Sequence, residues 1–183
     1  KSNHSKRSLI EIMKQSSFIV AASAATTGYV VMSFVMTATP ISMHVMDGFS
    51  LHHTKFIIQS HVIAMFLPSL FTAFIVKYLG ISKMMVLGVV LFFASIVVAY
   101  LSHNLNNYWM SLVLLGLGWN FLFIGGTSLL PKSYHENEKY KAQSLNDFLV
   151  FGFQAFAALS AGWFVFIFSW EVTLLSVIPI LII

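Results

Sequence analysis

The sequence has no cysteine and very few charged residues. The absence of cysteine from the 183 residues excludes a disulfide framework and a thiolate metal site. Charged residues make up only 9% of the chain, whereas an ordinary soluble domain carries about 25%. So small a share cannot cover a globular surface with solvated groups, which excludes a soluble enzyme and a soluble nucleic-acid-binding protein.

Long hydrophobic runs take the place of the missing charge. Hydrophobic residues make up 58% of the chain, and the mean hydropathy is +0.84. About 18–20 apolar residues are needed to cross the hydrocarbon core of a bilayer. Stretches that approach or exceed this length are predicted over residues 18–45, 56–76, 84–101, 108–130, 145–166 and 170–183. The sequence therefore predicts an all-α integral membrane protein with six transmembrane helices.

The chain is predicted to divide into two parts. A cytoplasmic amino-terminal segment, residues 1–16, precedes a six-helix membrane domain, residues 17–183. The first span is too long for a cleaved signal peptide. The sixth stretch is short for a span and no polar cap follows it, so we expect the native chain to continue beyond it.

Lysine and arginine fall almost entirely on one side of this topology. Nine of the ten lie in the amino-terminal segment or in the second and fourth connections, and only Lys55 lies on the opposite side. The positive-inside rule assigns the basic side to the cytoplasm. The formal net charge of +4 is therefore an orientation signal. We expect membrane lipid as a partner and no nucleic acid.

The predicted fifth span carries a polar stripe. Gln143, Asn146, Asp147 and Gln154 follow one another at helical spacing and share one face. Ionisable groups inside a membrane are costly and usually have a function, so Asp147 is a candidate proton or cation site in a water-filled cavity. The alternative is that Asp147 stabilises the amino terminus of its helix or pairs with a nearby lysine.

The predicted first span carries a second stripe. On or near one helical face lie Tyr29, Ser33, Met36, Thr37, Pro40 and His44. Such hydroxyls either line a solute path or form hydrogen bonds between helices. Proline frees a backbone carbonyl and kinks a helix, which suits a gating segment and equally a purely structural bend.

Single polar residues mark the second and fourth spans. Gln59 and His61 begin the second span, and a histidine there either titrates or contacts solute, or it forms a neutral hydrogen bond in the core. Asn120 lies in the middle of the fourth span, where a bare amide is costly. We expect Asn120 to face a solute, and an interhelical hydrogen bond is the alternative.

Motifs of enzymes and metal sites are absent. The sequence has no HExxH, GxSxG or P-loop motif. His44, Asp47, His52 and His53 gather toward the predicted outer face without a diagnostic ligand spacing. We therefore predict no enzyme activity, no catalytic residue, no metal site and no cofactor.

Several short motifs resemble those of one transporter superfamily. In the connection between the second and third spans, Gly80 and Lys83 match a glycine and a basic residue of its loop motif, whereas Lys77 replaces the motif's aspartate. The other motifs are MTATP at 36–40, QSH at 59–61, MFLPS at 65–69, GWN at 118–120 and QSLND at 143–147. With the six predicted spans, they resemble the carboxy-terminal half of a bacterial major facilitator superfamily transporter, and the resemblance covers nearly the whole chain.

This resemblance implies a fold, a location and a mechanism. A half of such a transporter contains two inverted three-helix repeats, and its substrate binds between the halves near the midplane of the bilayer. The first, second, fourth and fifth spans would then line the cavity, and Lys77, Gly80 and Lys83 would form a cytoplasmic gating loop. The implied protein is a secondary active transporter of the bacterial cytoplasmic (inner) membrane that moves a small solute by alternating access. Its partner is an amino-terminal six-helix half or a second copy.

Three points stay open at this stage. Proton coupling through Asp147 or His61 is one option, and Asp147 in the charge network of the gate is another. A membrane scaffold or assembly subunit without transport activity, and a half-transporter that acts as a homodimer, are the alternative functions. The candidate substrate or coupling residues are Asn120, Asp147, His61, Gln59, Gln143, Gln154, Tyr29, Thr37 and His44.

Overall fold

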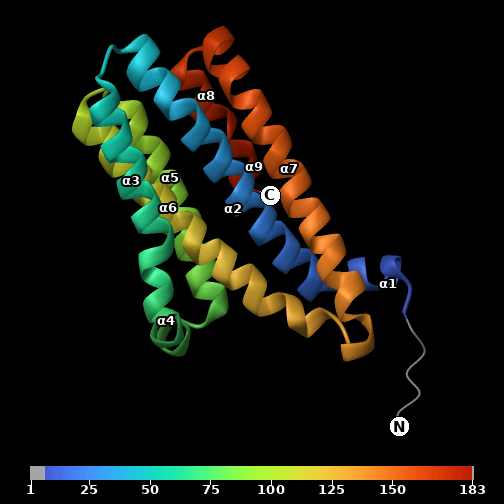
Figure 1. The fold of residues 1–183 in the computed structure, drawn as a ribbon. Coiled ribbons are helices and arrows are strands. Elements are labelled where there is room, and N and C mark those ends of the chain that lie inside the picture. Colours follow the sequence, from blue (N-terminus) through green and yellow to red (C-terminus); the bar gives the residue numbers. More distant parts are fainter. Residues whose placement is uncertain (1–6, 183) are drawn as a thin grey trace.

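The computed structural model describes residues 7–182, and these residues form a bundle of helices without strands (Figure 1). Residues 1–6, at the start of the predicted amino-terminal segment, and Ile183 lie outside the described part. The elements in chain order are α1 (Leu9–Met13), α2 (Ser16–Pro40), η1 (Ile41–Met46), α3 (Leu51–Phe66), η2 (Leu67–Phe71), α4 (Thr72–Leu79), α5 (Ile81–Leu101), α6 (Leu105–Leu129), η3 (Leu130–Ser133), η4 (Glu136–Glu138), α7 (Lys139–Phe168), α8 (Trp170–Ser176) and α9 (Ile178–Ile182).

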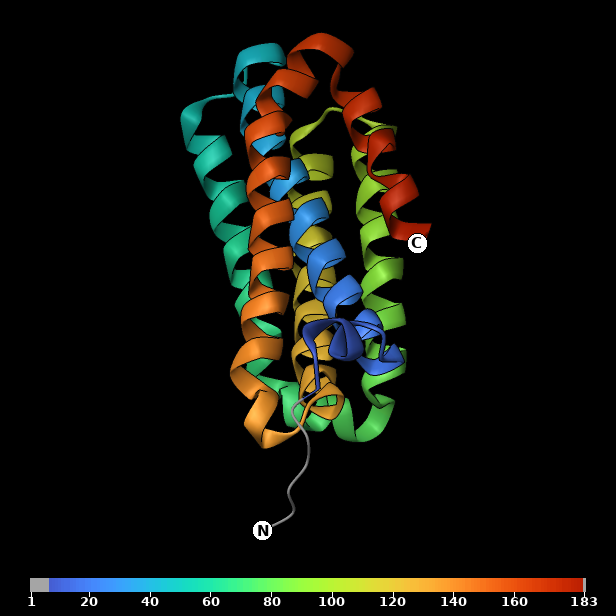
Figure 2. The same ribbon diagram turned by 90° about the vertical axis from the view of Figure 1, so that its right-hand side faces the viewer.

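Five continuous helical segments are long and apolar enough to cross a membrane. They are Ser16–Met46, Leu51–Leu79, Ile81–Leu101, Leu105–Ser133 and Glu136–Phe168. They coincide with the first five predicted spans, because long hydrophobic runs determine such helices directly. The predicted sixth span corresponds to the shorter apolar stretch Trp170–Ile182, which forms α8 and α9 beside α5 (Figure 2). The sixth span and the inverted-repeat arrangement stay predictions.

The connections between the long helices lie at two ends of the bundle (Figure 1). The turns at residues 47–50, 102–104 and 169 form one end, called here the Asp47 end. Residues 7–15, the turn at Gly80 and the connection over residues 130–138 form the other end, called here the basic end. Every described lysine or arginine except Lys55 belongs to the basic end or its adjoining helix turns.

The central helix of the bundle is α6. It packs against α5, α2 and α3, while α7 packs on the other side of α2. Close approach requires small residues: a Cβ at Gly116 would lie 2.7 Å from the carbonyl oxygen of His61 on α3, and a Cβ at Gly126 would lie 2.8 Å from that of Ala21 on α2. These two glycines therefore let two backbones contact α6 directly.

A proline interrupts each of the first two spans. The first span changes from α- to π-helical hydrogen bonding directly after Pro40, and Asp47 N–H donates to the Ser42 carbonyl five residues back. The second span changes to 3-10 geometry over Leu67–Phe71, which includes Pro68. Proline lacks the backbone N–H that an α-helix needs, so these irregular turns follow from the sequence.

Candidate functional site

A set of touching aromatic rings joins four of the spans. This aromatic cluster consists of Tyr29 on α2, Phe66 on α3, Trp119 and Phe123 on α6, and Phe151 on α7. Trp119 and Phe123 are stacked with centroids 5.0 Å apart and planes inclined by 7°. The Tyr29 ring meets Trp119, Phe123 and Phe151 edge-on, at 5.2, 5.7 and 5.5 Å. The cluster thus connects the first, second, fourth and fifth spans.

Sequence reasoning selected Tyr29 from this cluster and missed the other four rings. The chain has 18 phenylalanines and 4 tryptophans, so a single ring in an apolar helix carries no signal of its own. Only the contacts between helices distinguish these rings from the rest. The motifs MFLPS and GWN, which contain Phe66 and Trp119, were the available indication.

The acidic residue of the fifth span lies next to this cluster. Asp147 is exposed on α7 one helical turn before Phe151, and its Oδ1 accepts a hydrogen bond from Asn146 Nδ2 at 3.2 Å. Gln154, the next candidate along α7, is half-buried. Tyr29, Asp147 and Gln154 are therefore candidates that the fold leaves at least partly uncovered.

Two other candidates bind neighbouring helices. The Asn120 side-chain amide donates to the Met65 carbonyl at 2.6 Å and to Ser69 Oγ at 2.7 Å, so it holds α6 against the second span. His61 Nδ1 lies 2.7 Å from the carbonyl oxygen of Leu112 and holds α3 against α6. Both side chains are fully buried. Asn120 and His61 therefore lie in the α3–α6 interface, away from the exposed carboxylate of Asp147.

The remaining candidates are spread along the bundle. Thr37 is half-buried on α2, and Gln59 is exposed on α3. Gln143 donates from Nε2 to the Tyr134 hydroxyl at 3.1 Å near the basic end. His44 Nδ1 lies 2.7 Å from the Phe49 carbonyl oxygen at the Asp47 end. The structure does not bring these four residues together.

The predicted gating loop forms a tight turn. Gly80 has φ +75° and joins α4 to α5, while a Cβ there would meet nothing within 4 Å. The conformation rather than crowding therefore favours glycine at this position. Lys77 and Lys83 are both exposed on the adjoining helix turns, and the Lys77 ammonium lies 5.9 Å from the centre of the Tyr78 ring.

A polar network that sequence reasoning did not foresee closes the Asp47 end. The Tyr108 hydroxyl donates to Asp47 Oδ2 at 2.8 Å and lies 2.6 Å from Ser42 Oγ. His103 lies between two carboxylates, with Nδ1 3.4 Å from Asp47 Oδ2 and Nε2 2.9 Å from Glu171 Oε1. The network links residues that are far apart in the chain, which is why spacing alone gave no sign of it.

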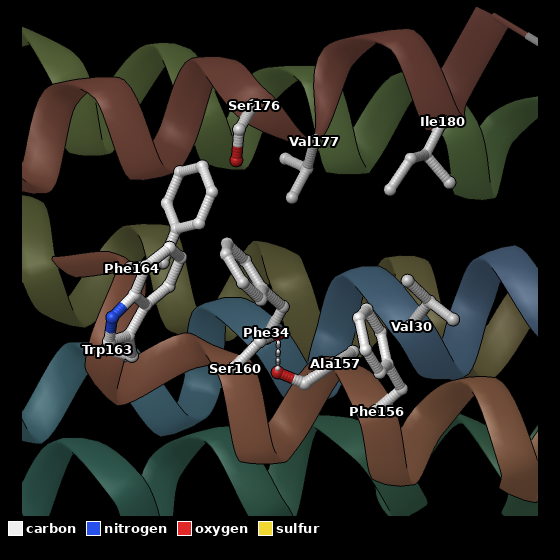
Figure 3. A pocket seen from close by; sticks show the side chains of 10 residues that line it. All are labelled: Val30, Phe34, Phe156, Ala157, Ser160, Trp163, Phe164, Ser176, Val177 and Ile180. Carbon is white, nitrogen blue, oxygen red and sulfur yellow. Dashed lines mark hydrogen bonds between the residues drawn. The ribbon is translucent and has the colours of Figure 1, made fainter. Parts of the chain in front are cut away.

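The pocket in Figure 3 differs in character from the aromatic cluster. It lies between α2, α7 and the α8–α9 stretch, with a volume of about 380 Å³, and carbon atoms line most of it. Its two hydroxyls are already bonded within their helices, Ser160 to the Ala157 carbonyl and Ser176 to the Thr173 carbonyl. None of the predicted site residues lines this pocket, whose surface suits acyl chains or another helix better than a polar solute.

Five helices of the described chain could span a bilayer, and several of their polar side chains bind one another or a neighbouring backbone. These features define a polytopic integral membrane protein. The sequence is similar to transporters over nearly its whole length. It is 40% identical over 174 residues to the riboflavin transporter RfnT of Brucella anthropi, a match that covers 95% of this chain and 44% of that protein. It is also similar to YdeG and YddS of Bacillus subtilis, both named as uncharacterized MFS-type transporters.

The match to YdeG is 35% identical over 134 residues and covers 72% of this chain and 31% of that protein. The match to YddS is 36% identical over 123 residues and covers 66% of this chain and 28% of that protein. No family model and no solved structure matches the sequence. The chain spans less than half the length of these curated relatives. By this homology it belongs to the major facilitator superfamily, which supports a role in transport and not in catalysis.

Proposed function

We propose that the chain is one half of a secondary active transporter in the bacterial cytoplasmic membrane. The observation that carries this proposal is the aromatic cluster, because it joins the same four spans that the superfamily resemblance assigns to the cavity. The second and fifth spans, which contain α3 and α7, are the least buried of the five: 11% and 22% of the residues in their apolar stretches are buried, against 56% for the first span. An uncovered face of this kind suits a second bundle that closes over a solute.

The proposed topology follows from charge. We assign the basic end to the cytoplasm, because the positive-inside rule relates such an excess of lysine and arginine to that side. The amino-terminal segment, residues 1–16, is then cytoplasmic, and residues 17–183 form the membrane domain. The second bundle is an amino-terminal six-helix half or a second copy of this chain. In either case the solute path lies between two bundles that rock against each other.

We propose riboflavin, or a closely related flavin, as the solute. The similarity to RfnT supports this choice, since it covers almost the whole chain. The chemistry of the uncovered face agrees with it: rings dominate, and Asp147 is the acidic group that adjoins them. A scaffold without transport activity would have no use for a carboxylate placed within a membrane helix, so it is the less favoured function.

We propose that Asp147 couples transport to protons. It is an exposed carboxylate on a membrane helix, one turn before Phe151, whose ring contacts Tyr29. A carboxylate so placed binds a proton most readily when the site opens to the more acidic side. Lysine and arginine are absent from α2 and α6, and the lysine of α3, Lys55, lies in the part of that helix nearer the Asp47 end.

Uptake measurements test this function directly. The full-length protein is reconstituted into liposomes, and uptake of labelled riboflavin is followed with and without an inward proton gradient. We expect the gradient to drive accumulation, and we expect Asp147→Asn to retain exchange of riboflavin without accumulation. The matched control is Asn137→Asp, which places a carboxylate in the exposed connection before α7 and leaves accumulation unchanged. Absence of riboflavin uptake by the unmodified protein would refute the proposed solute.

A further inference from the structure

We infer that the aromatic cluster is the surface on which the planar ring system of the solute stacks, an inference that rests on the proposed function. The cluster offers rings in several orientations within one contact network. Trp119 and Phe123 are nearly parallel, and Tyr29 stands at 84° and 86° to them. A flat heteroaromatic molecule gains stacking from parallel rings and edge contacts from perpendicular rings.

The cluster runs from a buried base to an open rim. Trp119 at its base is 3% exposed, whereas Phe66 and Phe151 at its two ends are 57% and 52% exposed. The two exposed rings come from the second and fifth spans, on either side of α2 and α6. A solute entering from the uncovered face therefore meets Phe66 and Phe151 first and the Tyr29 ring between them.

Unused hydrogen-bonding groups adjoin these rings. Trp119 Nε1 and the neighbouring Asn120 Oδ1 are both buried, and neither has a hydrogen-bond partner within residues 7–182. The Tyr29 hydroxyl also forms no hydrogen bond with the described residues. A buried N–H or C=O without a partner is costly in an apolar medium, because no water replaces the missing bond. A ring system with carbonyl and imino groups at its edge supplies the matching acceptors and donors.

Charge around the cluster selects among such ring systems. The acidic Asp147 lies one helical turn before Phe151, while the described lysine and arginine residues belong to the basic end, apart from Lys55 near the Asp47 end. A phosphate group would therefore find a carboxylate and no cation near the rings. The aromatic rings and the carboxylate of Asp147 should therefore accept the uncharged flavin ring and reject its phosphorylated form.

Two matched pairs of variants test the stacking surface in the full-length protein. Phe151→Leu removes a ring from the cluster, and Phe153→Leu removes an equally exposed ring, 55%, from the same helix without a ring contact to the cluster. Trp119→Phe removes the indole of the cluster, and Trp163→Phe removes an indole from the pocket shown in Figure 3. Both controls keep the kind of substitution constant, and Phe153→Leu also keeps the helix, whereas Trp163 lies on α7 and Trp119 on α6.

Two measurements follow these variants, binding of riboflavin and its uptake. Loss of a stacking ring costs about tenfold in affinity, so Phe151→Leu should raise the Kd of riboflavin about tenfold while Phe153→Leu leaves it unchanged. Stacking on an indole also quenches flavin fluorescence, so Trp119→Phe should reduce the quenching of bound riboflavin and Trp163→Phe should not. Lumichrome, the ring without the ribityl chain, should compete for binding, and the phosphorylated flavin should not.

The outcomes separate the inference from the proposed function. Equal affinities of Phe151→Leu and Phe153→Leu, or failure of lumichrome to compete, would overturn the stacking surface even if riboflavin is transported. Binding with the expected quenching but without uptake would uphold the stacking surface and refute transport of this solute. If Tyr29→Phe keeps the affinity and Tyr29→Leu lowers it, the Tyr29 ring, and not its hydroxyl, contacts the solute.

Discussion

Arg7 and Glu138 lie 131 positions apart in the chain and form a salt bridge at the basic end, with Nη2 and Oε2 2.5 Å apart. The same carboxylate accepts from Arg7 Nε at 2.9 Å, from the Arg7 backbone N–H at 3.1 Å and from the His135 backbone N–H at 3.0 Å. Glu138 is only 1% exposed. The hydrogen bonds to Glu138 raise the pKa of Arg7, so the pair stays charged. This contact fastens the segment before α1 to the connection between the fourth and fifth spans.

Loss of this carboxylate should destabilise the basic end. Glu138→Gln removes the charge that accepts hydrogen bonds from four donor groups, three of Arg7 and one of His135, and hydrogen bonds to a charged group are stronger than those between neutral groups. We expect a lower unfolding temperature in detergent, followed by tryptophan fluorescence. Glu136→Gln in the same turn is the control, because Glu136 is exposed. Equal unfolding temperatures for the two variants would contradict a stabilising role.

The close contact of α6 with α3 predicts a sharp difference between two glycines. In Gly116→Ala the new methyl group would lie 2.7 Å from the His61 carbonyl oxygen, which forces the helices apart. Overpacking of this kind costs about 1–3 kcal/mol, so the unfolding temperature should fall. Gly152→Ala adds the same methyl group where nothing lies within 4 Å, and it should leave stability unchanged or improve it. The prediction fails if both variants unfold together.

The interhelical bonds of Asn120 predict a loss of stability as well as of transport. Asn120→Ala removes the donors to Met65 and Ser69. The carbonyl of the buried Met65 and the hydroxyl of the exposed Ser69 then lack that bond. We expect about 1–3 kcal/mol of destabilisation in a thermal unfolding experiment. Asn106→Ala, at an exposed position of the same helix, should unfold like the unmodified protein. Unchanged stability in Asn120→Ala with abolished uptake would mean that Asn120 acts on the solute alone.

Helix α1 should respond to acid. The backbone N–H of Ser8, and then its hydroxyl, lower the pKa of Glu11 in the capping box. A lowered pKa in the folded state gives stability that is present above the unfolded-state pKa and is lost as the pH falls through the folded value. A spin label at Leu9→Cys should therefore become more mobile on acidification below pH 4.5, the ordinary value for this carboxyl. In Glu11→Gln the mobility should be the same at both pH values.

The sequence predicted the long helices well and the contacts between their polar groups poorly. The first five spans follow from local hydropathy, which does not depend on the rest of the fold. Asn120 and His61 bind backbone carbonyls of Met65 and Leu112, and a carbonyl is present at every residue. No residue pattern can therefore show which carbonyl a buried side chain will meet. Both side chains form an interhelical hydrogen bond, and their contact with a solute stays a prediction.

In the candidate site, too, the sequence predicted which helix face carries the polar residues but not which neighbours they contact. The helical spacing on the fifth span placed Asp147 and Gln154 on one face, and both are at least partly uncovered in the structure. Gln143 has the same spacing but binds Tyr134 at the basic end, because the connection before α7 folds back over it. Periodicity fixes direction around a helix axis, whereas the neighbours of a residue depend on how far along that axis it lies.

The prolines of the first two spans lie at different levels along the bundle. Pro40 lies in the part of its helix nearer the Asp47 end, and Pro68 lies past the middle of the second span toward the basic end. A helix bends most easily where its hydrogen-bond ladder is already irregular. The first two spans are therefore expected to bend most easily at different distances from the Asp47 end, so that a bend in one span leaves the corresponding level of the other straight.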